Sequence, residues 1–366
     1  MHYFCSLVVI FTFYLSNQSC CQADSLDQRI SIYSDISTKL SSLSDQDLIK
    51  LLYKAKRINS KITGESFVLN IDDTRIFVKK IPLTDLEKKS VNIKSTSNLF
   101  NLPLFYQYGI GSAGFGVWRE LMANIMTTNW VITRECPNFP IMYHWRMLSE
   151  TGPIKLNTDE IEQNIQNWGN SLEIRKRLES MIEASNHIFF FMEYIPYTLA
   201  QWLDNIIPIE DDTQANNIFS VLKTNIDTII SFINTHGFLH FDANFENIMT
   251  DGRNLYLSDF GLALSSKFKL SILETEFLDA HLQYDQCLVD INLFYYMAIN
   301  LWGQDQWKQK LQNFLNGQPE KSSPYIASMI DKYGTMAYNL KGDKDAKIHC
   351  LPSLKWLDQL SSKTPF

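Results

Sequence analysis

The feature that most constrains this chain is a pair of short apolar runs joined by an Asp-Gly turn. Ile248–Thr250 and Leu255–Ser258 flank residues 251–254, and Asp-Gly between apolar runs is a strong signal for a β-hairpin. Asn247 precedes the first run and Asp259 follows the second, so we expect both side chains at the open end of the hairpin. Amide and carboxylate oxygens are hard ligands, and the pattern therefore predicts a magnesium ion there, carrying nucleotide phosphates.

A second carboxylate precedes the hairpin. The stretch His240-Phe-Asp-Ala-Asn-Phe-Glu-Asn247 places Asp242 five residues before Asn247. At that spacing Asp242 lies within reach of the metal's surroundings and can accept a proton from an attacking hydroxyl group. Two acids and an amide in this order indicate phosphoryl transfer to an alcohol.

This order resembles the catalytic loop and metal motif of the protein-kinase-like superfamily: His-x-Asp, four residues, Asn, and then Asp-Phe-Gly, here at 259–261. The resemblance implies an α+β, bilobal protein-kinase-like fold, with a small β-rich N-lobe and a larger, mainly helical C-lobe. It implies ATP and Mg²⁺ as cofactors. In that reading Asp242 is catalytic, Asn247 and Asp259 hold the metal, and His240 is a structural hydrogen-bonding residue.

A strand and a helix upstream extend the resemblance. Residues 75–82 read as a strand that matches the superfamily's Val-Ala-Ile-Lys segment, which implies that Lys79 contacts the nucleotide's phosphates. Strand periodicity sends Lys80 to the opposite face, where we expect it to be solvated. Glu120 lies off the apolar stripe of a predicted helix and is the candidate partner of Lys79. Its alternative is a solvated glutamate on a polar helix face.

The run Phe189–Pro196 resembles the superfamily's hinge, a buried strand that breaks at a proline and leads into a helix. By that resemblance Met192 is the gatekeeper beside adenine, and backbone groups of Glu193 and Ile195 bond the edge of the base. The alternative is a core strand followed by an ordinary loop.

Several positions depart from the family pattern. No Gly-x-Gly-x-x-Gly precedes Lys79, position 244 is Asn where serine/threonine kinases carry Lys, and no Ala-Pro-Glu follows Asp259. Position 241 is Phe where regulated protein kinases carry Arg, so we predict no control through an arginine-bound phosphate on the activation loop. The loop is similar to the looser loops of aminoglycoside and choline phosphotransferases. Residues 60–300 also resemble a group of poorly characterised bacterial kinase-like proteins.

The resulting hypothesis is an ATP- and Mg²⁺-dependent phosphotransferase that transfers the γ-phosphate to a hydroxyl group, with a protein serine or threonine as the favoured acceptor. One alternative is a small-molecule kinase of the aminoglycoside or choline type, so the expected partners are ATP and either a protein or a small alcohol. Another alternative is a pseudokinase binding module. The missing glycines favour the module, and the intact Lys79, Asp242, Asn247 and Asp259 oppose it.

The length and net charge of the chain limit its expected partners and domain organisation. The 366 residues carry a formal net charge of −7, which argues against nucleic acid as a partner because such binding needs a basic surface. We expect an apolar segment at 1–23, a leading helical segment at 24–62, an N-lobe at 63–194 and a C-lobe at 195–366. A polar insert at 92–101 is expected to have no function.

The amino end leaves the compartment open. Residues 5–16 are apolar over the length of a signal-peptide core, and residues 21–23 resemble a cleavage site, yet no Lys or Arg precedes them. Three interpretations remain: an export signal, an anchor at a membrane surface, or an upstream start codon wrongly included. Dependence on ATP favours the cytoplasm, with an exported or membrane-associated chain as the alternative and membrane contact only through residues 5–16.

Overall fold

The computed structural model describes residues 18–61, 64–108, 111–149, 158–318 and 330. Contacts divide the chain into two compact units. We call Asn17–Ile195 with Ser258–Phe277 the sheet unit, and Pro196–Leu257 with the residues from Leu278 onward the helical unit. Each is described by itself, and the domain limits expected from the sequence stay predictions.

The sheet unit is built on one antiparallel sheet of five strands in the order β1-β2-β3-β5-β4. Its strands are β1 (Lys56–Lys61), β2 (Gly64–Ile71), β3 (Thr74–Leu83), β4 (Met142–Ser149) and β5 (Asn186–Glu193). The strand predicted at 75–82 is confirmed, and a tight turn precedes it, where Ile71 pairs with Thr74. The turn between β1 and β2, which precedes Lys79 and lacks the glycine motif, includes residues 62–63, which lie outside the described part.

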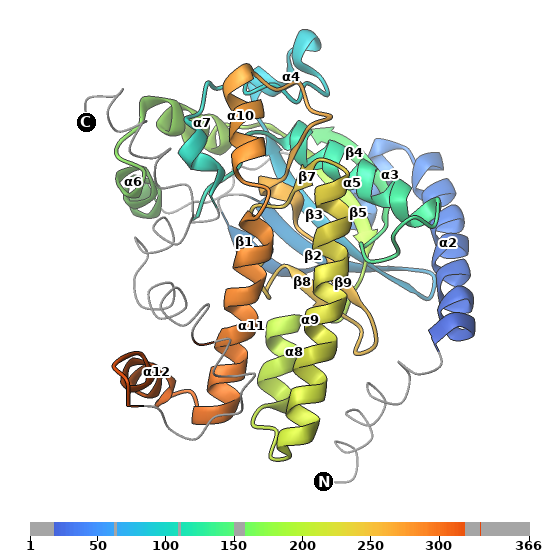
Figure 1. Ribbon diagram of the computed structural model, residues 1–366. Helices are drawn as coiled ribbons and strands as arrows, with labels where there is room; N and C mark the ends of the chain where they lie inside the picture. Colours follow the sequence, from blue (N-terminus) through green and yellow to red (C-terminus); the bar gives the residue numbers. More distant parts are fainter. Residues whose placement is uncertain (1–17, 62–63, 109–110, 150–157, 319–329, 331–366) are drawn as a thin grey trace. The chain divides into compact units, whose positions relative to one another are not determined.

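Helices surround this sheet within the same unit (Figure 1). They are α2 (Gln18–Ser42), α3 (Asp45–Leu52), α4 (Asp85–Lys88), α5 (Val117–Ile132), α6 (Thr158–Asn167) and α7 (Leu172–Ile182), with 3-10 turns η2 (Ser90–Asn92), η3 (Leu104–Gln107) and η4 (Phe260–Leu262). α5 packs on β3 and β4. Its buried Val117, Trp118 and Leu121 join Ile188 and Phe190 of β5 in one core cluster, so apolar burial fixes the helix on the sheet.

The helical unit contains α8 (Leu199–Ile206), α9 (Asp212–Thr235), α11 (Tyr284–Trp302) and α12 (Trp307–Leu315), and α10 (Ile272–Ala280) begins in the sheet unit and ends here. α9 and α11 lie side by side (Figure 1). The helical unit also contains the short strands β6 (Tyr197–Thr198), β7 (Phe238–Leu239), β8 (Ile248–Thr250) and β9 (Leu255–Leu257). The two-residue strand β10 (Leu264–Ser265) belongs to the sheet unit. The predicted hairpin is confirmed, because Ile248 pairs with Leu257. The α+β, protein-kinase-like fold expected from the resemblance, with a β-rich N-terminal part and a mainly helical C-terminal part, is likewise confirmed.

The prediction that Lys80 is solvated is wrong. Its side chain is buried, and its Nζ atom lies 3.1 Å from Oε2 of Glu65. The two residues are direct partners across the β2–β3 ladder, and opposite charges in such positions attract. Strand periodicity predicted the face of the sheet on which Lys80 lies, but it did not predict that Glu65 would be its ion-pair partner on that face.

The membrane-associated alternative is also corrected. No helix in the described ranges is long and apolar enough to cross a bilayer. Residues 21–23, which were expected to resemble a cleavage site, belong to helix α2. Residues 5–16, on which the proposed membrane contact depended, lie outside the described residues.

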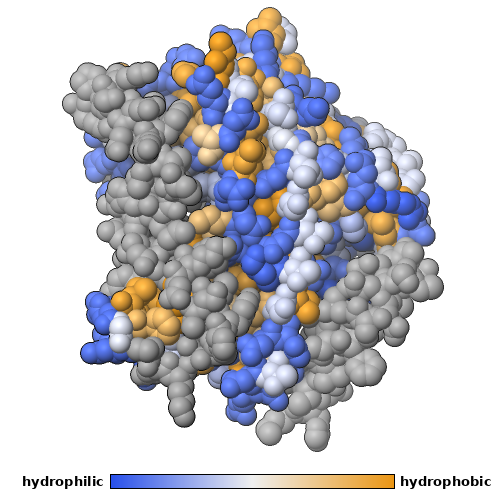
Figure 2. All heavy atoms as spheres, in the orientation of Figure 1, coloured by the Kyte–Doolittle hydropathy of each residue, from blue (hydrophilic) through white to orange (hydrophobic). Residues whose placement is uncertain are grey.

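Exposed apolar side chains are dispersed. Figure 2 shows hydrophilic and hydrophobic residues mixed over the described part of one face. Among the most exposed apolar side chains are Val91, Leu172 and Ile272, which come from η2, α7 and α10. Ile272 is followed by a second exposed apolar residue, Leu273. Exposed apolar residues in ones and twos are normal for a protein surface.

Candidate active site

Three charged side chains meet in the sheet unit. The Nζ atom of Lys79, on β3, lies 2.6 Å from Oε1 of Glu120 and 2.7 Å from Oδ1 of Asp259. Glu120 comes from the first turn of α5, and Asp259 directly precedes η4. Lys79 and Glu120 are largely buried, whereas half of the Asp259 side chain is exposed. The structure thus brings together three residues that were singled out from separate stretches of sequence.

This arrangement holds Lys79 as an ammonium ion. Burial alone would lower the pKa of Lys79, but the carboxylates of Asp259 and Glu120 outweigh it and raise the pKa above the ordinary value for lysine. Opposite charges at this distance favour the charged form. A fixed positive charge with three donor hydrogens, beside a half-exposed carboxylate, suits the binding of phosphate oxygens.

Glu120 owes its place to a buried carboxylate that was not predicted. α5 begins after Gly116 without a capping side chain of its own. Instead, Oε1 of Glu87 accepts the amide of Val117 at 2.9 Å, and the Glu87 carbonyl accepts Trp118 Nε1 at 2.9 Å. Glu87 thereby accepts a hydrogen bond from a backbone amide that has no partner within the helix, because it lies in the first turn. The available signal was the capping box Thr84-x-x-Glu87, which the structure contains.

The backbone around Asp259 is fixed by a close approach. Asp259 itself has φ +62°, in the left-handed region. A Cβ atom on Gly114 would lie 2.3 Å from the Gly261 carbonyl oxygen, and Gly114 has φ +72°. Phe260 is buried against Phe139, with ring centroids 6.2 Å apart. Only glycine at 114 fits both this contact and this backbone conformation. The loop before α5 therefore packs directly against the turn that carries Asp259.

In the helical unit, Asp242 is oriented by two amides. Nδ2 of Asn247 donates to the Asp242 carbonyl and to its Oδ2, both at 2.8 Å. Nδ2 of Asn244 donates to Oδ1 at 2.8 Å. These bonds fix the carboxylate plane of Asp242, and they are made by the NH2 group of Asn247, whose other polar side-chain atom is its carbonyl oxygen.

A buried acid that was not predicted supports this loop. Asp285, at the start of α11, accepts the amide of His240 at 2.6 Å and that of Phe241 at 2.8 Å. Phe241 has φ +62° and is fully buried. Two charge-assisted bonds therefore hold the strained turn that delivers Asp242. The signal in the sequence was an acid in the first turn of a largely apolar helix.

Asp285 should make stability depend on pH. Burial raises its pKa to about 6, although the two amide bonds oppose this. The native state then holds its proton more tightly than the unfolded chain, so stability is lost as pH rises from 4 to 7, by about 3 kcal/mol for this group. We expect urea unfolding at a series of pH values to show this slope in wild type relative to Asp285→Asn. Parallel curves for the two proteins would contradict it.

The expected hinge lies at the end of β5. Met192 is buried there, and the Glu193 amide donates to the Ile141 carbonyl at 2.8 Å. The Glu193 carboxylate forms two bonds of 2.8 Å with Arg29 of α2. Ile195 is also buried. The leading helix thus holds the strand end, which no local pattern indicated, because Arg29 is remote in sequence.

Comparison with known proteins gives a partial likeness. No family model matches the chain. A probable serine/threonine-protein kinase of Dictyostelium discoideum is 35% identical over 91 residues, which are 25% of this chain and 17% of that protein. Serine/threonine-protein kinase MAK of Homo sapiens is 30% identical over 89 residues, 24% of this chain and 14% of its own length. Serine/threonine-protein kinase ICK of Mus musculus is also 30% identical over 89 residues, 24% of this chain and 13% of its own length.

The matched region spans less than a fifth of each of these relatives. It supports a place in the protein-kinase-like superfamily and a kinase-like phosphotransferase. The relatives are eukaryotic and do not show the likeness to bacterial proteins.

Proposed function

We propose that this chain is an ATP- and Mg²⁺-dependent phosphotransferase that transfers the γ-phosphate of ATP to a hydroxyl group, with a protein serine or threonine as the favoured acceptor. The observation that carries the proposal is the Lys79 ammonium held between Glu120 and Asp259. The partial similarity to serine/threonine kinases supports it.

The residues present fit Mg²⁺. No cluster of three or more His, Cys, Asp and Glu side chains within the described ranges could hold a metal ion by itself. Mg²⁺ needs no such cluster, because it keeps waters and phosphate oxygens as ligands beside one or two protein oxygens. We assign these to Asn247 and Asp259. They belong to different units, so this pairing rests on the sequence pattern. When bound, Mg²⁺ neutralises phosphate charge.

The chain's own groups would then divide the work. Lys79 neutralises phosphate oxygens as charge moves toward the leaving group, and Glu120 orients it. Asp242, aligned by Asn244 and Asn247, positions the acceptor hydroxyl and takes its proton. For adenine we assign Met192 as the flanking side chain and backbone groups of Glu193 and Ile195 as hydrogen-bonding partners. The Glu193 amide already donates to Ile141, so we assign its carbonyl oxygen to the base.

The direct test is transfer of label from γ-³²P-ATP, with and without a chelator of Mg²⁺. Protein extracts and a panel of small alcohols serve as parallel acceptors, followed by mass spectrometry of the product. Label on serine or threonine residues supports the proposal, and label on small alcohols alone rejects the protein acceptor. Wild-type protein that labels nothing in any arm rejects the phosphotransferase.

Nucleotide binding can be measured separately. We expect ATP with Mg²⁺ to raise the melting temperature by several degrees, because a ligand at 100 times its Kd adds about 2.7 kcal/mol of stability. The shift should be smaller when the chelator is present and smaller still in Lys79→Met. An unchanged melting temperature at millimolar ATP would favour the pseudokinase module.

A further inference from the structure

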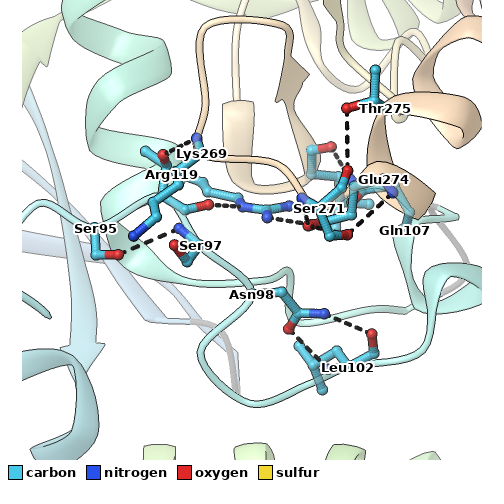
Figure 3. A network of polar contacts seen from close by, with 12 residues as sticks. Ser95, Ser97, Asn98, Leu102, Gln107, Arg119, Lys269, Ser271, Glu274 and Thr275 are labelled. Atoms are coloured by element: carbon cyan, nitrogen blue, oxygen red, sulfur yellow. Dashed lines mark hydrogen bonds and ion pairs between the residues drawn. The ribbon is translucent and has the colours of Figure 1, made fainter.

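A second ion pair lies beside Glu120 and is almost fully buried. Arg119, the preceding residue of α5, pairs through Nη2 with the Glu274 carboxylate in α10, and their side chains are 3% and 4% exposed. Figure 3 shows the Arg119 side chain reaching across to the turn that carries Ser271 and Glu274. Arg119 Nε also donates to the Thr96 carbonyl at 2.7 Å. The guanidinium lies 5.0 Å from the centroid of the Phe115 ring, so apolar surface encloses it.

Glu274 is itself held by the segment that follows Asp259. Its Oε2 accepts the Ser271 amide at 2.9 Å and the Ser271 hydroxyl at 3.0 Å. Earlier in the same segment, the Lys269 amide donates to Oγ1 of Thr96 at 2.7 Å, and Gln107 donates to the Leu262 carbonyl. The insert at 92–101, expected to have no function, therefore supplies one of these anchors through Thr96.

These contacts couple two ion pairs. Arg119 and Glu120 are consecutive residues of one helical turn, so a rotation or slide of α5 that withdraws Glu120 from Lys79 also withdraws Arg119 from Glu274. Separating a buried pair leaves an uncompensated charge in an apolar site, which is strongly unfavourable. The paired state of Lys79 and Glu120 is thus favoured by a contact that touches neither residue.

We propose that Glu274 is a positioning residue for phosphoryl transfer: through Arg119 it holds α5 so that Glu120 stays on Lys79, and the chain is competent with no phosphate on residues 263–277. This inference rests on the proposed phosphotransferase function and extends it to regulation. A carboxylate built into the sequence provides the negative charge that faces Arg119. Phe241, which stands where regulated kinases carry Arg, agrees with a chain that does not use an added phosphate.

The test compares Glu274→Gln with a matched control, Glu65→Gln. Both replace a buried, ion-paired carboxylate of the sheet unit by its neutral isostere, and Glu65 pairs with Lys80 across the β2–β3 ladder rather than with a residue of α5. Removing the Glu274 charge should lower kcat by about tenfold while the KM for ATP changes by less than about threefold, because Lys79 is misplaced rather than lost. Glu274→Asp, which keeps the charge, should recover part of kcat. Glu65→Gln should lower the melting temperature with little change in kcat.

Hydrogen exchange gives a readout that needs no activity. The amides of the first turns of α5 should exchange faster in Glu274→Gln than in Glu65→Gln, because the ion pair that holds this helix through Arg119 is lost. Wild type treated with a protein phosphatase should keep its kcat. A kcat and an exchange pattern like those of wild type in Glu274→Gln would overturn the inference, and so would loss of activity after dephosphorylation. Wild type without transfer to any acceptor would instead reject the proposed function. In that case the hydrogen-exchange data alone would show whether the Arg119–Glu274 pair holds α5 in place.

Discussion

Replacing Asp242 by Asn is expected to lower kcat by about 10²–10⁴-fold, the range typical of a lost general base. The amide has nearly the same shape and keeps one acceptor oxygen, but its NH2 group would face the Nδ2 donor of Asn244 or Asn247, so one of these two hydrogen bonds is lost. The amide also cannot take the proton of the acceptor hydroxyl. The KM for ATP should change little. Initial rates of label transfer at saturating ATP measure both quantities.

Glu246→Gln is the matched control for Asp242→Asn. Glu246 is an exposed acid in the same loop, and its carboxylate accepts the Thr198 hydroxyl at 3.2 Å. Its substitution removes the same charge four residues away, and we expect a kcat close to that of wild type. Equal rates in wild type and Asp242→Asn would reject Asp242 as the base.

Lys79→Met should have the next largest effect, a loss of about 10²–10³-fold in kcat, because a fixed charge on the phosphates is removed. It should also destabilise the fold by about 3–5 kcal/mol, since Glu120 would be left buried beside Asp259 without its cation. Label transfer measures the first effect and urea unfolding the second.

Lys80→Met separates these two effects. Lys80 is the next residue along β3 and is also buried in an ion pair, but on the other face of the sheet. We expect it to cost stability and to leave kcat close to that of wild type. A similar loss of kcat in both variants would mean that strand damage, rather than phosphate contact, explains the effect of Lys79→Met.

Local patterns carried much of the fold and the candidate site. The Asp-Gly turn predicted the β8–β9 hairpin because turn residues constrain backbone dihedral angles directly. Strand periodicity predicted β3 and the face that Lys79 occupies. Serine is a favoured residue before a helix, and the Ser44 side chain does accept the Asp47 amide at the start of α3.

The supporting acids were not predicted, for a common reason. Glu87, Asp285 and Glu274 each act on backbone or side chains that are 30 to 155 residues away. No pattern with a period of two or 3.6 residues encodes a partner at such a separation. The same limit explains the error at Lys80, whose partner Glu65 became visible only with the β2–β3 register.

The bonds between Arg29 and Glu193 extend the proposed nucleotide-binding site beyond the strands and helices that would face ATP. A chain shortened to begin after Ser42 would keep every group assigned to adenine, phosphate and acceptor. It would nevertheless lose the cation that steadies the last residue of β5. Affinity for the purine ring of ATP would then depend partly on α2, a segment to which no contact with the purine is assigned.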